Sequence, residues 1–326
     1  RPRAGQGHIH PAQQFLVLAS SLPFAFAMRR TWTFQSAGQI VFGPGAVAEL
    51  GDRVARLASA RGSASARGSA SDALAARAAA CRVLIVTDAA LVKAGLVERV
   101  AAPLAAAGHG VATFAEGEPE PSLDVAEACA QFGRAHDPQV VLGLGGGSNM
   151  DLAKIAALLL THGGTARDYL GENRVPGPVL PLVCVPTTAG TGSEVSHCGV
   201  LTDTVHQVKV STLSNWLRPT LALVDPLMTV SCPPKVTADS GIDALAHAIE
   251  AYTAVPNDDY PVPVLEHSVY QGTNPLDDVL AEEAIRLIGQ HLVTAVREPH
   301  CLAAREAMAL AALLAGLELV PVAVHL

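Results

Sequence analysis

Asp243 and His247 stand four residues apart and form the pair in the sequence best suited to hold a metal ion. Residues at this spacing share one face of a helix, so the carboxylate and the imidazole would point the same way. Carboxylate oxygen and imidazole nitrogen both suit Fe2+ and Zn2+. The same spacing also fits an ordinary Asp–His hydrogen bond within a helix, and the pattern alone leaves both interpretations open.

Three glycines, Gly145, Gly146 and Gly147, lie between an apolar segment at residues 140–144 and a helical pattern at residues 149–161. Glycines let a backbone approach a phosphate closely, and the start of a helix adds free N–H donors and the positive end of its dipole. A plain tight turn between a strand and a helix would have the same composition. The glycines therefore indicate a phosphate-binding loop only if other residues support it.

Two further features supply that support at the ends of other predicted strands. Asp88 ends the apolar segment at residues 82–88. A carboxylate there can bind a ribose diol and repel a 2′-phosphate, or it can cap the next helix. Residues 186–194, Pro-Thr-Thr-Ala-Gly-Thr-Gly-Ser-Glu, offer hydroxyls and bare N–H groups after another buried strand. The carboxyl ends of parallel strands are where α/β proteins bind ligands, so both features favour a cofactor site.

The elements that must position these residues alternate between strand and helix as far as residue 226, which predicts an α/β fold with a parallel sheet. A short strand, a turn and a helix start are expected within residues 38–50. Further strands are expected at 82–88, 111–114, 140–144, 180–185 and 221–224, and helices at 91–107, 122–136 (capped by Ser122) and 149–161. Beyond the boundary region, residues 226–234, only helices are expected, at 238–253, 275–297 and 302–317.

Composition excludes several classes of protein. The 326 residues are 50% hydrophobic and 16% charged, which is typical of a folded chain rather than a disordered one. A net charge of -8 and an aromatic content of 4% argue against a nucleic-acid partner. Six cysteines without a Cys-x-x-Cys pair indicate free thiols in a reducing compartment, so a cytoplasmic location is expected. No membrane partner is expected either.

Two segments are predicted to carry no chemistry. Residues 1–27 precede Met28 and contain an apolar run of about 13 residues, too short for the roughly 20 that span a bilayer. They are interpreted as an extension or a leader. Residues 59–70 repeat the hexamer Ser-Ala-Arg-Gly-Ser-Ala, which has no large apolar group to anchor it, and are expected to form a surface loop or a frayed helix end.

Six other histidines show no spacing typical of metal ligands, and each is expected at the surface or at a helix cap. They are His162, His197, His206, His267, His291 and His300.

Taken together and in order, four segments resemble the iron-containing (group III) alcohol dehydrogenases. They are residues 145–154 (Gly-Gly-Gly-Ser-Asn-Met-Asp-Leu-Ala-Lys), 186–194, 223–226 (Leu-Val-Asp-Pro) and 241–252 (Gly-Ile-Asp-Ala-Leu-Ala-His-Ala-Ile-Glu-Ala-Tyr). The resemblance runs from about residue 33 to residue 317. Residues 270–275, Tyr-Gln-Gly-Thr-Asn-Pro, further resemble the hydroxyacid-oxoacid transhydrogenase branch.

This resemblance implies a dehydroquinate synthase-like architecture of two domains. Residues 28–226 would be the dinucleotide-binding α/β domain, and residues 227–326 an all-α metal and substrate domain that is incomplete here. The cleft between them would hold NAD(P) and a divalent metal, Fe2+ or Zn2+. NAD is the expected preference because of the charge on Asp88.

The resemblance also implies individual roles. Pyrophosphate contacts fall to Gly145, Gly146, Gly147 and Ser148, with Asp151 in the same segment; Asp88 meets the adenosine ribose; Thr187, Thr188 and Thr191 line the cofactor; Lys209 lies near the nicotinamide ribose; Asp243 and His247 are metal ligands. The family completes its metal site with two histidines from a glycine-rich segment after the last helix matched here. Residues 318–326 offer only His325, so weak binding of a divalent cation is expected.

The activity implied is a metal-dependent transfer of hydride between an alcohol or hydroxyacid and NAD(P). The alternatives are a transhydrogenase that converts 4-hydroxybutyrate to succinate semialdehyde with 2-oxoglutarate as acceptor, and an inactive truncated nucleotide-binding remnant. A carbon–oxygen lyase of the dehydroquinate synthase type shares the two-domain plan but fits residues 186–194 less well. The expected partner is a small alcohol, aldehyde or hydroxyacid, and a homo-oligomer is left open.

Overall fold

The computed structural model describes residues 31–63, 80–259 and 269–319. Residues 1–27, His267 and His325 lie outside the described residues, as does most of the hexamer repeat. The part of the repeat that is described, residues 59–63, continues helix α2 (Leu50–Ser63).

Six parallel strands form the main sheet in the order β1-β9-β6-β4-β2-β3, which confirms the predicted α/β fold. Every pair in it is parallel, so the carboxyl ends of all the strands meet at one edge. The central strands are apolar on both faces and fully covered, as is typical of parallel sheets. Their bounds are β1 Ile40–Phe42, β2 Arg82–Val86, β3 Gly110–Phe114, β4 Val140–Gly145, β6 Leu182–Pro186 and β9 Leu221–Val224.

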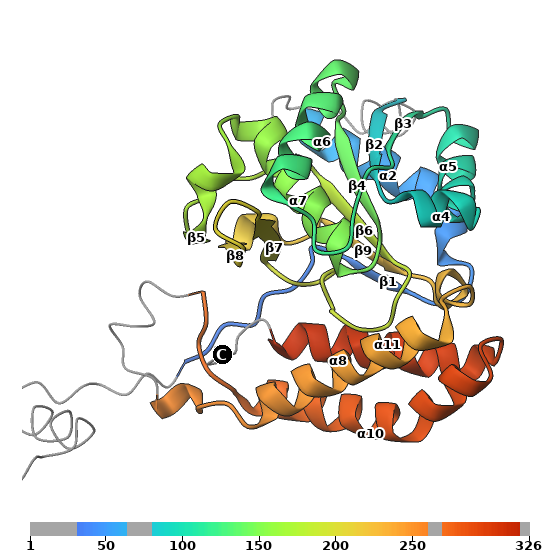
Figure 1. The fold of residues 1–326 in the computed structure, drawn as a ribbon, viewed down its shortest axis with the longest axis vertical. Coiled ribbons are helices and arrows are strands. Elements are labelled where there is room, and N and C mark those ends of the chain that lie inside the picture. The colour runs from blue at the N-terminus through green and yellow to red at the C-terminus, as the bar shows by residue number, and fades with distance from the viewer. Residues whose placement is uncertain (1–30, 64–79, 260–268, 320–326) are drawn as a thin grey trace, which may run out of the picture.

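Helices cover both faces of this sheet (Figure 1). One face packs against α2 and α5 (Leu96–Ala106), with Leu50, Val100 and Leu104 in its core. The opposite face packs against α6 (Leu123–His136) and α7 (Gly147–His162). Helix α7 is almost wholly buried because Leu, Ile, Met and Ala occupy nearly all of its faces.

Three long helices follow the sheet in the chain and form a separate layer beside it (Figure 1). They are α8 (Pro234–Tyr252), α10 (Pro275–Arg297) and α11 (Leu302–Leu319). Their shared core is rich in alanine, which lets the helices approach closely, and is filled by Leu287, Ile288 and Met308. Asn274 caps α10 and Pro275 occupies its first turn, which is why this helix begins where the sequence predicts.

A second sheet of three strands, β5-β8-β7, was not expected from the sequence. β7 (Cys198–Asp203) and β8 (Val208–Leu213) pair as an antiparallel hairpin, and β5 (Gly171–Glu172) adds to its edge. Their mixed pattern of Val, Thr, Ser, Lys and Gly carries no long apolar run. The small sheet places Cys198 and Lys209 next to segments far away in the sequence.

The predicted helix at residues 91–107 is in fact two helices. α4 (Ala89–Lys93) ends at Ala94, and α5 begins after Gly95, whose φ of 73° breaks the helical path. Shorter turns complete the chain: η1 Ala46–Glu49, η2 Ala166–Tyr169, η3 Asn215–Leu217, η4 Pro226–Thr229 and η5 Asn257–Asp259. Across the described ranges, none of the helices has the length and apolar character needed to span a membrane.

Candidate cofactor and metal site

The glycine-rich turn forms an open helix start at the carboxyl edge of the main sheet. β4 ends at Gly145, whose φ is +146°, and α7 begins at Gly147. Gly146 occupies the capping position without a side chain to bind the first N–H groups, and the first turn holds no acidic residue. These N–H donors are therefore available to an anion such as a phosphate.

The threonine-rich loop packs directly against this turn. A Cβ atom on Gly147 would lie 2.7 Å from Cγ2 of Thr191, and one on Gly146 would lie 3.3 Å from Oγ1 of Thr188. The N–H of Thr187 donates to the main-chain oxygen of Gly145 at 3.0 Å. The structure thus brings together two of the segments that the sequence analysis assigned to the cofactor, and glycine is required for the close approach.

Asp88 performs the capping role that the sequence left open, and it also bonds to the glycine-rich turn. Its Oδ1 accepts from the N–H groups of Ala90 (2.8 Å) and Leu91 (3.0 Å), which caps α4. Its Oδ2 accepts from Nδ2 of Asn149 at 2.7 Å. Asn149 was not singled out in the sequence, although it joins Asp88 to the start of α7. Capping therefore fixes the position of Asp88 rather than competing with a cofactor role.

Lys154 is the most important residue that sequence reasoning missed. Its side chain is fully buried, and Nζ donates to Oγ of Ser193 (2.8 Å), Oγ of Ser196 (2.9 Å) and the main-chain oxygen of Cys198 (2.7 Å). Asp151 lies 3.4 Å away through Oδ1. One ammonium group thereby ties α7 to the end of the threonine-rich loop and to β7. A lysine on a helical face that is otherwise apolar was the available signal.

Asp151 completes this network rather than lying free in the glycine-rich turn. Its Oδ1 accepts from Oγ of Ser193 at 2.6 Å, and its Oδ2 accepts from the N–H of Val200 at 3.0 Å. Both oxygens are thus occupied by the chain itself. The contacts place Asp151 as a support beneath the cofactor loops.

The same loop also meets the helical layer. A Cβ atom on Gly190 would lie 2.7 Å from Cβ of Ser240 in α8. Gly192, with φ of +63°, lies against Gly316 of α11, where an added Cβ would come within 2.3 Å of the Cα atom. The loop is therefore the contact between the glycine-rich turn and two helices of the second layer.

Glu194 ends this loop in an enclosed position. Only 3% of the residue is exposed, and burial raises the pKa of its carboxyl to about 7, although the nearby Lys154 charge acts in the opposite direction. A carboxyl with this pKa is expected to change its charge near neutral pH.

Asp243 and His247 lie one turn apart on α8, as the spacing predicts. Nε2 of His247 is 3.7 Å from Oδ1 of Asp243, too long for a strong hydrogen bond. Nδ1 of His247 is buried and has no hydrogen-bond partner. Nε2 is the ring nitrogen that faces the Asp243 carboxylate, so Nε2 and Oδ1 of Asp243 are the two donor atoms placed to share a divalent metal. No group of three or more His, Cys, Asp or Glu that could hold a metal ion occurs in the part of the chain that is described, so these two donors form an incomplete ligand set.

Two other expectations meet a different outcome. His197 was expected at the surface or in a cap, but only 2% of it is exposed and neither ring nitrogen has a partner. That prediction is wrong because tertiary contacts cover the residue: its carbonyl accepts from the N–H of Ser214, just after β8, and its ring meets the ring of Tyr270. Lys209 lies on β8 and is 61% exposed, with Nζ 2.8 Å from Oε1 of Glu120. Its predicted position near the nicotinamide ribose stays a prediction.

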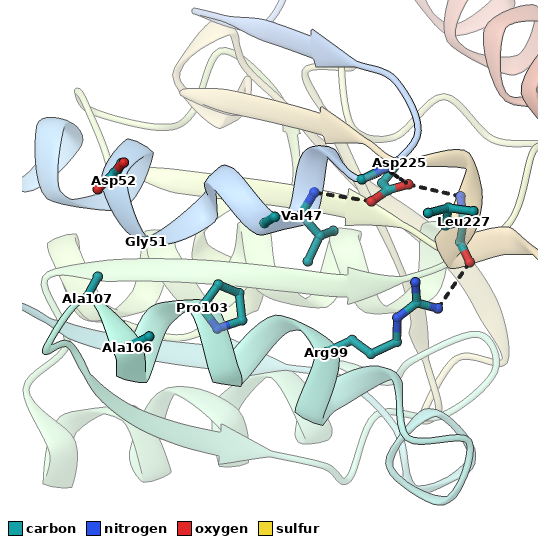
Figure 2. A pocket seen from close by; sticks show the side chains of 11 residues that line it. Val47, Gly51, Asp52, Arg99, Pro103, Ala106, Ala107, Asp225 and Leu227 are labelled. Atoms are coloured by element: carbon teal, nitrogen blue, oxygen red, sulfur yellow. Dashed lines mark hydrogen bonds between the residues drawn. The ribbon is translucent and has the colours of Figure 1, made fainter.

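An open groove lies elsewhere, between η1, α2 and α5 (Figure 2). Its volume is about 610 Å3, and none of the predicted cofactor or metal residues lines it. Asp225 closes one end by accepting from the N–H groups of Gly45, Val47 and Leu227. The Leu-Val-Asp-Pro segment noted in the sequence thus anchors the start of η1 to the end of β9.

The fold and the candidate site define a class of protein with two parts. A parallel α/β sheet carries an open glycine-rich helix start, and a layer of helices follows it in the chain. The chain belongs to the iron-containing alcohol dehydrogenase family. The model for that family, described as "Iron-containing alcohol dehydrogenase", matches residues 62–226, and its C-terminal counterpart matches residues 237–325.

Individual relatives agree with this assignment. Long-chain-alcohol dehydrogenase 1 of Geobacillus thermodenitrificans is 41% identical over 244 residues, which cover 74% of this chain and 57% of that protein. The mitochondrial hydroxyacid-oxoacid transhydrogenase of Xenopus tropicalis is 35% identical, covering 75% of this chain and 55% of that one.

A solved structure shares the fold as well. Sulfoacetaldehyde reductase from Bifidobacterium kashiwanohense, in complex with NAD+, superposes with a TM-score of 0.70 at 30% identity. The match covers 89% of this chain and 67% of that one. The two curated relatives named above are longer than this chain, which spans less than two thirds of the length of each.

Proposed function

We propose that the chain is the NAD-binding part of a metal-dependent oxidoreductase that moves hydride between a small alcohol or hydroxyacid and NAD. The observation that carries this proposal is the uncapped start of α7 packed against the threonine-rich loop. An uncapped helix start with glycines supplies the N–H donors that a pyrophosphate needs. Family membership and the NAD+ complex of the Bifidobacterium relative support the choice of ligand.

The cofactor residues divide the work by position. The N–H groups of Gly147 and Ser148 bind the pyrophosphate, and Asp88 binds the adenosine ribose from the end of β2. Thr187, Thr188 and Thr191 line the nicotinamide half, and Lys209 reaches the nicotinamide ribose. Asp151 and Lys154 hold the two loops together from beneath. The chain thereby orients the nicotinamide and excludes water, while the cofactor carries the redox step.

The metal pair adds the second half of the chemistry. Asp243 and His247 would hold a divalent cation, Fe2+ or Zn2+, as two of its ligands. When bound, such a cation acts as a Lewis acid toward the oxygen of the substrate. The 3.7 Å separation of Nε2 of His247 from Oδ1 of Asp243 supports this role, because the two donor atoms face each other across one turn of α8.

NAD should be preferred over NADP because the Asp88 carboxylate repels a 2′-phosphate and is held in place by two backbone N–H groups and by Asn149. Fluorescence titration of the full chain with NADH and NADPH tests this. We expect NADH to bind at least about tenfold more tightly, a difference of about 1.4 kcal/mol. Asp88→Asn should narrow the ratio, whereas Asp52→Asn, an exposed aspartate on α2, should leave it unchanged. Equal binding of both cofactors by the unmodified chain would refute the role of Asp88.

A transhydrogenase is the second candidate, favoured by residues 270–275 and by the relative of that name in Xenopus tropicalis. That reaction would oxidise 4-hydroxybutyrate to succinate semialdehyde and reduce 2-oxoglutarate, with no net consumption of NAD, while this chain keeps NAD bound. Incubation with both substrates and a substoichiometric amount of NAD distinguishes the two. Succinate semialdehyde in excess of total NAD identifies the transhydrogenase, and a yield limited to the NAD present identifies the simple dehydrogenase.

The setting of the protein is also part of the proposal. All six cysteines are free in the structure, which supports a reducing compartment and hence the cytoplasm. A homo-oligomer is proposed as its working form. Light scattering of the purified chain measures the mass of the assembly directly.

A further inference from the structure

His197 is buried with its full hydrogen-bonding capacity unused. The residue is 2% exposed, and both Nδ1 and Nε2 lack a partner. A neutral imidazole carries one donor and one acceptor, and leaving both unpaired away from water is unfavourable. Such an atom in a folded protein calls for a ligand or another explanation.

Arg218 brings an uncompensated positive charge to the same place. Its Nε donates to Oδ1 of Asn215 at 3.0 Å, and its Nη1 donates to the main-chain oxygen of Val195 at 3.3 Å. Both acceptors are neutral, and no carboxylate of the described residues forms an ion pair with it. Burial lowers the pKa of this guanidinium to about 10, which marks the cost of holding the charge there.

Two contacts bring the chain segments that carry Arg218 and His197 together. Arg218 binds the carbonyl of Val195, two residues before His197, and the carbonyl of His197 accepts from the N–H of Ser214 at 3.1 Å. These segments therefore run side by side. The ring of Tyr270 meets the His197 ring edge-on, with centroids 5.7 Å apart. Burial, Arg218 and Lys154 lower the pKa of His197 to about 3, so its imidazole stays neutral in this positive field.

The group also lies beside the proposed cofactor loop. His197 follows Glu194 by three residues, and Lys154 binds Ser196 and the carbonyl of Cys198 on either side of it. A ligand held by Arg218 and His197 would therefore be positioned from the same support that holds the threonine-rich loop.

We propose that Arg218 and His197, walled by Tyr270, form a subsite for the carboxylate of the substrate. This inference rests on the proposed function and narrows its substrate class to hydroxyacids and oxoacids. A carboxylate would accept from the free N–H groups of Arg218 and from the N–H of the His197 imidazole, and its charge would balance the guanidinium. A neutral alcohol of equal length would leave both unsatisfied.

Binding tests the subsite without requiring turnover. The full chain is first titrated with NAD+ by calorimetry, which tests the proposed function by itself. The NAD+-loaded protein is then titrated with butyrate, 1-butanol and inorganic phosphate. We expect butyrate to bind at least tenfold more tightly than either of the others.

Substitutions then locate the binding. Arg218→Gln should weaken butyrate binding by tenfold or more, Arg218→Lys by less, and His197→Phe by about threefold. Arg99→Gln is the matched control, because Arg99 donates to the carbonyl of Leu227 in the groove between η1, α2 and α5. Its butyrate affinity should equal that of the unmodified chain.

Kinetics supply the second measurement on the metal-supplemented protein. The ratio of kcat/KM for 4-hydroxybutyrate to that for 1-butanol should fall tenfold or more in Arg218→Gln and in no control. If NAD+ fails to bind, the proposed function is wrong. If NAD+ binds but butyrate does not, or if phosphate competes equally, or if Arg99→Gln matches Arg218→Gln, the subsite is overturned while the cofactor site stands.

Discussion

Two regions of this molecule differ in how well the chain satisfies its own polar groups: the Lys154–Asp151 network beneath the cofactor loops, and the Asp243–His247 pair on α8. Beneath the two cofactor loops, the Lys154 ammonium has three close acceptors and a carboxylate, and both oxygens of Asp151 are occupied. On α8, Asp243 and His247 are 3.7 Å apart, and a buried nitrogen has no partner. The first region is organised by internal bonds before any ligand arrives, whereas the second needs something added.

This difference separates stability from function in a testable way. A polar group that is satisfied inside the protein should be costly to remove. Removing a polar group that only a ligand would pair should change the stability of the free protein little. The loss of stabilisation should appear only when the ligand is present.

Lys154→Met should give the largest effect. It leaves Ser193, Ser196 and the Cys198 carbonyl without the ammonium donor and Asp151 without its ion pair, so the free energy of unfolding should fall by about 3 to 5 kcal/mol. Urea denaturation followed by circular dichroism measures the change. Lys235→Met is the control, since Lys235 is 84% exposed in its pair with Asp239 and should cost under about 1 kcal/mol. Similar losses in both variants would show that the buried network does not organise the loops.

Gly192→Ala should have the next largest effect. The new methyl group would meet the backbone of Gly316, and φ of +63° is unfavourable for alanine, so we expect a loss of about 2 to 3 kcal/mol. Gly289→Ala on α10 is the matched control, because no atom lies within 4 Å of its added Cβ. That change should raise stability by up to about 1 kcal/mol through better helix propensity. Thermal unfolding of both proteins should therefore move in opposite directions.

Glu194→Gln should change how stability depends on pH. The folded pKa of about 7 lies above the ordinary value of 4.5, so the contribution of Glu194 is fully present below pH 4.5 and is lost as the pH rises through 7. Relative to the unmodified chain, the variant should therefore gain about 3 kcal/mol between pH 4.5 and pH 8. Urea titrations at five pH values measure the difference.

Two details guard this measurement. Burial also raises the pKa of Asp277 to about 7, but that effect is common to both proteins and cancels in the difference. Glu98→Gln, at an exposed position on α5, should keep the pH profile of the unmodified chain. If the difference in unfolding free energy between Glu194→Gln and the parent does not vary with pH, the raised pKa of Glu194 is contradicted.

His247→Leu should give the smallest change in the metal-free protein, within about 1 kcal/mol and of either sign, because Nδ1 loses no partner. Its effect should appear with Zn2+. The parent chain should show a modest rise in Tm when Zn2+ is added, and the variant should show none. His291→Leu on α10 should keep the rise. A large loss of stability in metal-free His247→Leu would mean that this side of the molecule is internally satisfied after all.

Much of the fold followed from local patterns. Continuous apolar strands and periodic helices predicted the α/β sheet and the later helices, and Ser122 and Asn274 mark helix starts through ordinary caps. The β7–β8 hairpin was not predicted because strands on a small, half-exposed sheet have no long apolar run. The break between α4 and α5 at Gly95 was not predicted because the apolar periodicity continues through it.

The sequence by itself determined the types of residue at the candidate site, since the glycines, Asp88, the threonines and the Asp243–His247 pair are read from local spacing. Only the tertiary structure decided which of them meet. Thr191 lies against Gly147, Lys154 binds Ser193, and Arg218 lies beside His197, across gaps of 21 to 44 residues. Such contacts arise where strands from separate parts of the chain end at one sheet edge, and no local pattern records them because their free energy comes from burial shared between distant segments.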